Sequence, residues 1–378
     1  MRAEHRRVLF FLLKAAVVGA FLFWLARRGA LDPRYFAIAS GGLGWLLLGL
    51  ACLAASISLT AVRYWLILRM FRVRQPLPFV LRTEFAATFF NLCSLGPLGG
   101  DVVRLYFMAR SSGKGLAAAG ATMTDRIVGL LALLLLTLAS LALTGVDYLA
   151  EPVLREAVVL LSGLLAGAVG LALTAAVRLR LGRVAAICAG GAAAAAAVTY
   201  SLWAETAFGW SVAAGLAAAT VCAGGFQAAF VGALLRRIGR WGGFGEKLDE
   251  TLAAMSDAAG HPRAIAGVLG LALVQQAGYV LAMLCLAWAM NLPARPDAGS
   301  IFFATPLTFI LAVLPLPGAG LGFNEAAFDS LLALAAPHLA GGASLYLFFR
   351  AWLIAVSFAG IPFYLFERRK SRSGGPTS

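Results

Sequence analysis

Long apolar runs separated by short basic clusters limit what this chain can fold into more than any other feature. Of its 378 residues, 61% are hydrophobic and 13% are charged, and its mean hydropathy is +0.87. A soluble domain cannot hide that much apolar surface, whereas a run of about 20 apolar residues crosses a bilayer as a helix. The sequence therefore predicts an all-α polytopic membrane protein.

Two apolar stretches are unsuited to cross a membrane as continuous helices. The first, at about 80–110, is interrupted by Asn91, Pro97, Gly99, Gly100, Asp101 and Arg104. Proline removes a helical hydrogen bond, and charged side chains are unfavourable in lipid. Non-helical backbone survives at membrane depth only where protein or a water-filled cavity surrounds it. We therefore expect a re-entrant helical hairpin here.

The second stretch, at about 301–335, has the same character near the C-terminus. Its apolar run is broken by Pro315, Gly320, Gly322, Asn324 and Glu325. Either stretch alone could equally be a loop with helix caps. Two broken segments in the two halves of a chain are a better indication of a transporter binding site. We therefore expect a second re-entrant hairpin.

The remaining apolar runs predict the membrane spans. We expect about eight spans, two of them in the alanine-rich region 184–235 and the others at 8–26, 43–68, 118–144, 153–177, 264–290 and 343–366. Because successive spans cross the membrane in opposite directions, the basic clusters between them all fall on the same side. By the positive-inside rule that side is cytoplasmic, so we expect a bacterial inner-membrane protein with both termini in the cytoplasm.

These spans give one membrane domain over residues 1–370. Residues 244–259 have the pattern of an amphipathic helix on the cytoplasmic surface, and 371–378 form a disordered tail. An odd number of spans lies between the hairpins, so the hairpins open to opposite faces, as in an inverted-topology repeat. A single span within 184–235, instead of two, would reverse this parity.

Several function classes lack their sequence signatures. The five cysteines show no paired spacing, the three histidines are scattered, and neither a P-loop, an HExxH motif nor a GxSxG elbow is present. We therefore expect no metal, no cofactor and no enzymatic activity. The net charge of +14 comes from basic clusters between apolar runs. Membrane topology explains such clusters better than a nucleic-acid partner does.

Ionisable residues inside apolar segments are the candidates for function. A charge at the bilayer centre is unfavourable by about 2.5 to 3.5 kcal/mol, so such residues are retained for a reason. Asp101 and Arg104 form either a structural ion pair or, with the N–H groups of the preceding glycines, an anion site. Glu325 and Arg350 either pair with each other across the bundle, or Glu325 takes up a proton while Arg350 holds a phosphate. Arg63 has the same two interpretations, a structural ion pair or a functional charge. Asp125 and Arg126 are either membrane-surface anchors or part of the site.

The residues from Asn91 to Arg110, together with Asp125 and Arg126, resemble the first signature of the lysylphosphatidylglycerol-synthase transmembrane-domain family. The segment PLPGAGLGFNEAAF at 315–328 is similar to the second signature, but Asn324 occupies the position of the usual arginine. The resemblance covers roughly residues 8–366. It implies a flippase-like membrane domain for lipids or lipid-linked head groups, in some relatives alongside envelope-lipid synthesis enzymes.

That resemblance does not extend to the soluble aminoacyl-transferring domain of the full-length synthases. Only residues 367–378 follow the last predicted span, so we do not expect this chain to synthesise an aminoacylated lipid. The leading interpretation is an inner-membrane, flippase-like transporter of a lipid or a lipid-linked anion. Two alternatives are a membrane-embedded enzyme or accessory subunit of lipid glycosylation, and a small-solute secondary transporter.

The most specific expectation joins the two hairpins into one site. Hairpins that open to opposite faces would bring their tips together near the bilayer centre. One polar pocket would then separate residues of the first hairpin from residues of the second, with Arg350 at its wall. The facing residues would be Gly99, Gly100 and Arg104 on one side and Gly320, Gly322 and Glu325 on the other.

Overall fold

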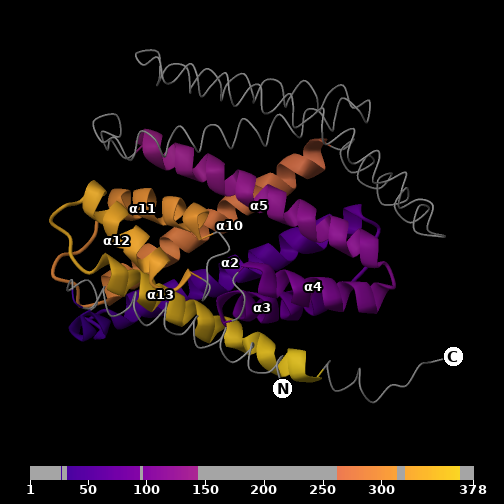
Figure 1. Cartoon of the computed structure of the whole chain (residues 1–378), viewed down its shortest axis with the longest axis horizontal. Coiled ribbons are helices and arrows are strands. Elements are labelled where there is room, and N and C mark those ends of the chain that lie inside the picture. The colour runs from indigo at the N-terminus through magenta and orange to yellow at the C-terminus, as the bar shows by residue number, and fades with distance from the viewer. Residues whose placement is uncertain (1–26, 28–31, 94–96, 144–261, 313–319, 367–378) are drawn as a thin grey trace, which may run out of the picture.

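The computed structural model describes residues 27, 32–93, 97–143, 262–312 and 320–366. All regular elements within these ranges are helices, so the predicted all-α class is confirmed. In chain order they are η1 (Pro33–Phe36), α2 (Leu43–Met70), α3 (Leu77–Cys93), α4 (Pro97–Ser112), α5 (Gly115–Leu143), α10 (Pro262–Ala289), α11 (Ala298–Leu311), α12 (Phe323–Ala335), α13 (Gly342–Ser357) and η3 (Phe358–Gly360) (Figure 1).

Four helical segments in the described part of the chain are long and apolar enough to cross a membrane. They are Leu43–Met70, Gly115–Thr137, Arg263–Ala289 and Gly342–Phe366. They coincide with the spans predicted at 43–68, 118–144, 264–290 and 343–366, so the chain is a multi-pass membrane protein. The other predicted spans, the amphipathic helix at 244–259 and the tail at 371–378 lie outside the described residues.

Helices α2 and α10 lie side by side and run in opposite directions. Just before α2 begins, the backbone N–H of Ala39 donates to the carbonyl of Ala289, at the end of α10, over 2.9 Å. Further along α2, a Cβ added to Gly278 would lie 2.4 Å from Ser56 Oγ. The absence of a side chain at Gly278 permits this approach, and small residues commonly allow such close packing of membrane helices.

Helices α3 and α4 pack against each other and form the two legs of a helical hairpin, here called hairpin 1. Pro97 is the first residue of α4, a position where its missing N–H leaves no helical bond unmade. Beyond the two legs, Lys114 Nζ donates to the carbonyl oxygen of Arg72 over 3.3 Å. The loop that leads into hairpin 1 and the loop that leaves it therefore lie at the same end of the bundle.

Helices α11 and α12 form a second packed pair, hairpin 2, at the opposite end. The N–H of Asn291, in the loop leading into this hairpin, donates to the carbonyl of Ala37 over 3.0 Å. Beyond the hairpin, Ser344 Oγ accepts from the N–H of Asp32 at 3.2 Å. Both connections of hairpin 2 therefore lie beside the segment that precedes α2. Figure 1 shows the two hairpins at opposite ends of the bundle.

Asp297 starts α11 as its N-cap, because its side chain accepts from the N–H of Ser300 at 2.9 Å. Partial burial raises the pKa of Asp297, but hydrogen bonds from Ser300 lower it more, so the net pKa lies below its usual value. The carboxylate therefore stays ionised beside the positive end of the helix dipole, where a negative charge is stabilising.

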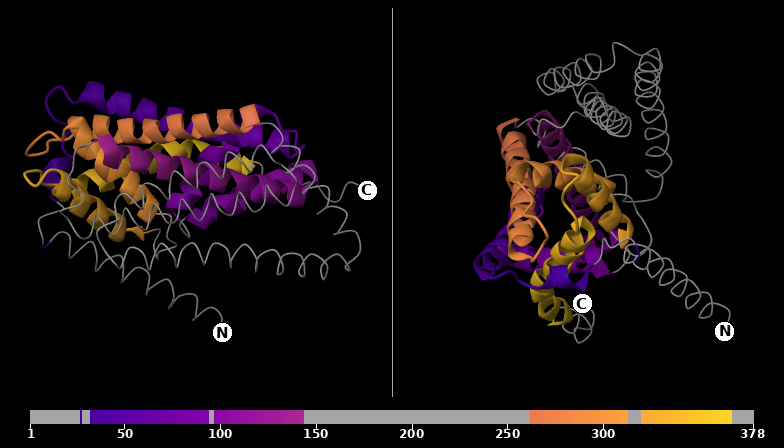
Figure 2. Two further views of the ribbon diagram at one scale, coloured as in Figure 1. Left: turned by 90° about the horizontal axis from the view of Figure 1, so that it is seen from above. Right: turned by 90° about the vertical axis from the view of Figure 1, so that its left-hand side faces the viewer.

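The contacts between helices show an internal symmetry that relates the first four of them to the last four. If α2, α3, α4 and α5 are replaced in turn by α10, α11, α12 and α13, each contacting pair becomes another contacting pair. Thus α3–α4 becomes α11–α12, and α5–α11 becomes α13–α3. The antiparallel α2–α10 pair becomes itself. The end-on view in Figure 2 shows these eight helices as one bundle.

Two apolar cores fill the bundle, one near each hairpin. The core near hairpin 2 includes Leu53, Leu134, Met283, Phe303, Phe328 and Leu345. The core near hairpin 1 includes Tyr64, Ile67, Val80, Val103, Phe107 and Ala121. Between the two cores, the buried residues include the polar side chains of Thr60 and Arg63 on α2 and of Asp125 on α5. The fold therefore holds a polar layer between two apolar layers.

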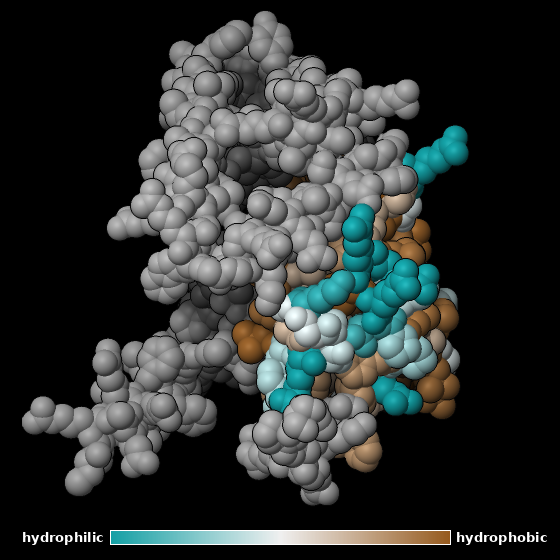
Figure 3. All heavy atoms as spheres, turned by 90° about the vertical axis from the view of Figure 1, so that its right-hand side faces the viewer, coloured by the Kyte–Doolittle hydropathy of each residue, from teal (hydrophilic) through white to brown (hydrophobic). Residues whose placement is uncertain are grey.

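Exposed basic side chains are concentrated at the end where hairpin 1 is connected. They are Arg69, Arg72, Arg74, Arg82, Arg110, Lys114 and Arg263. Figure 3, which views this end, shows hydrophilic side chains gathered beside apolar flanks. Among the described residues, the opposite end carries the pair Asp32 and Arg34 and the nearby Arg295 and Asp297. Positive charge is therefore distributed unequally between the two ends.

This asymmetry predicts the orientation of the bundle in the membrane. We expect Arg74→Cys, in the loop before hairpin 1, to be protected in intact cells from a membrane-impermeant thiol reagent, because basic loops stay in the cytoplasm. Arg295→Cys, in the loop before hairpin 2, should react. The unsubstituted protein gives the background from native cysteines. The opposite labelling pattern would show that the bundle is inverted.

Candidate functional site

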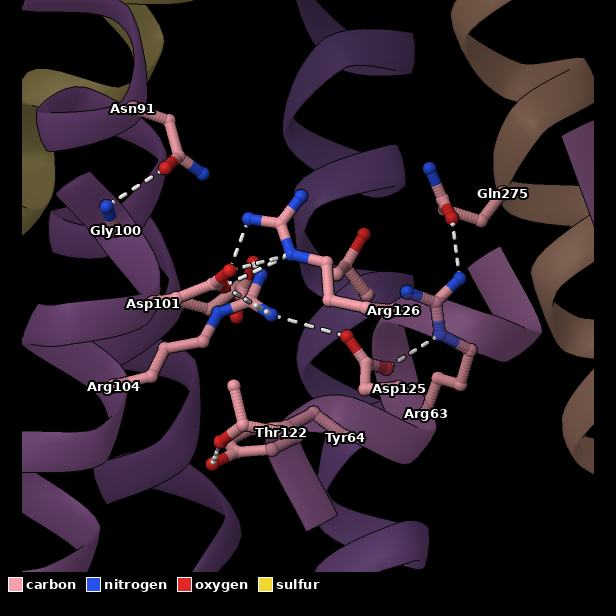
Figure 4. Close-up of polar contacts among 12 residues, drawn as sticks. Arg63, Tyr64, Asn91, Gly100, Asp101, Arg104, Thr122, Asp125, Arg126 and Gln275 are labelled. Carbon is pink, nitrogen blue, oxygen red and sulfur yellow. Dashed lines mark hydrogen bonds and ion pairs between the residues drawn. The ribbon is translucent and has the colours of Figure 1, made fainter. Parts of the chain in front are cut away.

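A chain of buried polar contacts crosses the layer between the two apolar cores. Arg63 on α2 donates from Nε to Asp125 Oδ1 over 2.8 Å, and from Nη1 to Gln275 Oε1 on α10 over 2.8 Å. The Asp125 side chain is 2% exposed and that of Arg63 is 5% exposed. Figure 4 shows this chain of contacts, with Arg63 between Asp125 and Gln275.

Arg104 on α4 extends the same chain into hairpin 1. Its Nη1 donates to the second oxygen of Asp125 over 3.0 Å, and its Nη2 contacts Glu84 Oε1 on α3. Two arginines are therefore balanced by two carboxylates, and Asp125 bridges the two arginines. Because a buried ion pair is tolerated only when each charge is matched and hydrogen-bonded, these contacts fix how five helices meet.

A second ion pair joins α4 to α5 beside this chain. Arg126 donates to Asp101 from Nε over 2.7 and 3.0 Å and from Nη2 over 2.8 Å, in the two-pronged geometry of a strong arginine–carboxylate pair. The expected partners Asp101 and Arg104 are 3.9 Å apart. Each of them makes a shorter contact with another helix. The contact between Asp101 and Arg104 within α4 is therefore the weaker of the two contacts that Asp101 makes.

Hairpin 2 contributes a further ion pair. Glu325 on α12 lies 3.6 Å from Arg350 on α13, as one interpretation of the sequence expected. The other oxygen of Glu325 accepts from the N–H of Gly322 at 2.6 Å and so caps the start of α12. Gly322 has a φ of +88° and Gly320 a φ of +70°. Both values lie in a region that favours glycine.

A cavity of about 520 Å³ lies among these groups. It is lined by both hairpins and by the long helices between them. Its polar lining consists of Thr60, Arg63, Glu84, Thr88, Asn91, Arg104, Asp125, Arg126, Gln275, Gln276, Tyr279, Asn324, Tyr346 and Arg350. Such a volume is typical of small-molecule sites, which occupy about 300 to 1,000 Å³.

Apart from Pro97, which begins α4, the predicted site residues fall into four groups. Those that line the cavity are Asn91, Arg104, Asp125, Arg126, Asn324 and Arg350. Three others do not line the cavity but contact a residue that does: Gly100 contacts Asn91, Asp101 contacts Arg126, and Glu325 contacts Arg350. The glycines at 99, 320 and 322 are not among the lining residues. Pro315 lies outside the described part of the chain.

Burial also separates the two interpretations of Asp125. A membrane-surface anchor would place its charge at the interface, but Asp125 is 1% exposed and bonded to two arginines. Arg126 is more accessible, with 36% of its side chain exposed. Asp125 is therefore a buried member of the cavity wall. Arg126 lies at the edge of the cavity.

Glu84 is the main site residue that the sequence interpretation missed. It lies on α3 only two residues after the basic cluster ends at Arg82, and it lacks a neighbouring proline or glycine. The signal that could have found it is general: an ionisable residue inside an apolar membrane segment. Gln275 on α10 also joins two helices, because it accepts a hydrogen bond from Arg63 on α2.

One edge of the cavity is apolar and exposed. Met123, Ile127 and Leu130 on α5 line the cavity, and they are 64%, 57% and 38% exposed. They follow each other at helical spacing, so they lie on one face of α5. Charged groups on the inner wall of the cavity are therefore bordered by a hydrocarbon surface that faces out of the bundle.

The sequence profile of the lysylphosphatidylglycerol synthase TM region matches residues 11–199. The match covers half of the chain, and this protein belongs to that family, as its sequence resemblance predicted. The matched segment includes hairpin 1 and Asp125, whereas hairpin 2 lies beyond it. A comparison with curated proteins and with solved structures found no match.

The close packing inside hairpin 1 generates a stability prediction. A Cβ at Gly100 would lie 2.3 Å from the carbonyl oxygen of Ala87 and 2.7 Å from the Asn91 side chain. We therefore expect Gly100→Ala to lower the thermal unfolding temperature of the purified protein. Gly44→Ala on α2 is the matched control, since a Cβ there meets nothing within 4 Å. It should be neutral or slightly stabilising. Equal melting temperatures for the two variants would contradict this packing.

Proposed function

We propose that this protein is a flippase-like transporter that moves a lipid, or a lipid-linked anionic head group, across the bacterial inner membrane. The observation that carries this proposal is the cavity between the two hairpins. Four arginines reach its wall from four different helices, and one edge is exposed hydrocarbon. A polar interior beside an apolar opening suits an amphiphile better than a small solute.

The arginines favour a phosphate as the group that enters the cavity. A guanidinium presents several N–H donors in a planar fork that matches phosphate oxygens, and arginine is therefore frequent at phosphate sites. Arg104 and Arg350 come from opposite halves of the chain and line the same cavity. A head group bound between them would contact both halves at once.

The apolar edge of α5 favours a lipid over a water-soluble anion. Met123 and Ile127 are more than half exposed, yet they border the charged interior. A head group could enter between α5 and its neighbours while its acyl chains remain against these side chains. The charged group then crosses the membrane inside the protein and never enters the hydrocarbon.

The arrangement of the helices supports alternating access. We infer that α2–α5 and α10–α13 are inverted repeats, because the exchange that relates their contacts maps the antiparallel α2–α10 pair onto itself. The two hairpins would then be re-entrant segments that approach the cavity from opposite faces of the membrane. Rocking of one repeat against the other would open the same site to each face in turn.

Transport can be measured in proteoliposomes that carry a fluorescent phosphatidylglycerol in both leaflets. Dithionite bleaches only the outer leaflet, so empty vesicles should lose about half of the signal, and vesicles with the protein should lose most of it. Water-soluble glycerol 3-phosphate, tested by flux into the same vesicles, distinguishes a lipid from a small solute. Bleaching that stops at the level of the empty vesicles would contradict lipid transport.

The apolar edge gives a sharper prediction. Ile127→Asn should slow the movement of the fluorescent lipid, because an amide disturbs the surface along which the acyl chains would lie. Val274→Asn is the matched control: Val274 is 59% exposed and Ile127 57%, but only Ile127 lines the cavity. Bleaching rates in proteoliposomes compare the two variants at equal protein content. Equal slowing by both would indicate that the α5 edge has no special role.

A further inference from the structure

The charged groups around the cavity cancel one another. Arg63 and Arg104 are matched by Glu84 and Asp125, Arg126 by Asp101, and Arg350 by Glu325. Among the described residues, the arginines of the cavity therefore carry no excess positive charge. An anion that entered this site would bring a negative charge that these arginines do not balance. A charge held inside a protein without a counter-charge is strongly unfavourable unless something compensates it.

Protonation of a carboxylate would supply this compensation, and the four carboxylates differ in whether they can accept a proton. Both oxygens of Asp125 accept hydrogen bonds from arginines, and both oxygens of Asp101 accept from Arg126. Glu325 uses one oxygen to cap α12, and its Oε1 is buried without a hydrogen-bond partner, 3.6 Å from Arg350, but Glu325 does not line the cavity. Asp125 and Asp101 therefore have no free oxygen for a proton, and Glu325 cannot contact an anion in the cavity directly.

Glu84 is different. Its Oε1 contacts Arg104, while its Oε2 is fully buried without a hydrogen-bond partner. The residue is 2% exposed and lines the cavity. Arg104 likewise has an unpartnered Nε. A buried acceptor and a buried donor without partners are rare in native proteins, and they suggest that a proton or a ligand group belongs there.

We propose that Glu84 takes up one proton for each negative charge that the cavity binds, so that anion binding and protonation are coupled. This inference rests on the proposed function, because it concerns the same cavity and the same arginines. The proton adds to Glu84 Oε2 and converts the carboxylate into a neutral carboxylic acid. Arg104 then lacks one of its counter-charges and is available to an anion such as a lipid phosphate.

The groups facing Glu84 from the neighbouring helices determine the direction of this coupling. Burial of Glu84 and the nearby Asp125 on α5 disfavour the ionised carboxylate, whereas Arg104 on α4 and Arg63 on α2 favour it. Tyr64 on α2 and Tyr279 on α10 are the other titratable groups that sense its charge. Arg350 reaches the cavity from α13. An anion that draws Arg104 away from Glu84 removes the strongest support for the ionised form, so binding favours protonation.

Isothermal titration calorimetry counts the protons. The probe is dioctanoyl phosphatidylglycerol, titrated into the detergent-solubilised full chain in two buffers that differ in ionisation enthalpy. The difference in apparent binding enthalpy gives the protons taken up per lipid. We expect a value approaching one at a pH where Glu84 is ionised in the free protein, with the Kd rising by up to tenfold per pH unit. Lipid binding without proton uptake would overturn the inference and leave the proposed function intact.

Substitution assigns the proton to a residue. Glu84→Gln should bind the lipid without proton uptake and with a Kd independent of pH. Asp329→Asn is the control, since Asp329 accepts from the N–H of Ala343 and does not line the cavity. It should keep the proton uptake of the unsubstituted protein. Uptake that persists in Glu84→Gln would contradict the assignment.

If that variant does not fold, the proton count of the unsubstituted protein still decides whether binding and protonation are coupled. A lack of lipid binding by the unsubstituted protein would contradict the proposed function itself.

Discussion

The bridge that Asp125 makes between two buried arginines is the contact on which the rest of this structure depends. A charge inside a membrane protein must be matched, because lipid offers it neither water nor a counter-ion. Asp125 holds Arg63 on one oxygen and Arg104 on the other, and these arginines extend the chain to Gln275 and Glu84. Sliding one of these helices along another would separate the matched charges. The polar chain specifies one register.

The breaks in the two hairpins allow this layer to exist. A continuous span would pass through the centre of the bundle and leave no room for a cavity. Each broken segment instead places the start of a short helix, α4 or α12, within the bundle. Gly100 and Gly322 make this possible in different ways. Gly100 allows α4 to approach α3, whereas Gly322 supplies the positive φ from which α12 begins.

Hydropathy and helix-breaking residues were sufficient to predict much of the fold. Four of the predicted spans are apolar helices in the structure, and both broken stretches are pairs of packed helices. These features could be predicted because they depend on local composition: a long apolar run requires a helix, and proline with glycine interrupts it. The predicted spans within 144–261 lie outside the described residues, so the expected total of about eight stays a prediction.

The partners of the charged residues could not be predicted in the same way. Sequence spacing suggested that Asp101 pairs with Arg104, but the closer partner of Asp101 is Arg126 on the next helix. The sequence around Glu84 does not mark it as a site residue, because it follows a basic cluster and has no neighbouring proline or glycine. Which charges meet depends on how helices pack across long stretches of chain, and no local pattern encodes that. Family membership indicates a membrane protein connected with lipids, while the cavity suggests how a lipid would be held.

An experimental structure of the protein in nanodiscs containing phosphatidylglycerol tests the central claim most directly. That claim is that both hairpins form one cavity for a lipid head group. The account predicts a lipid phosphate in contact with Arg104 or Arg350, with acyl chains along Met123 and Ile127. Lipids bound only on the outer surface of the bundle, with water alone between the hairpins, would contradict it.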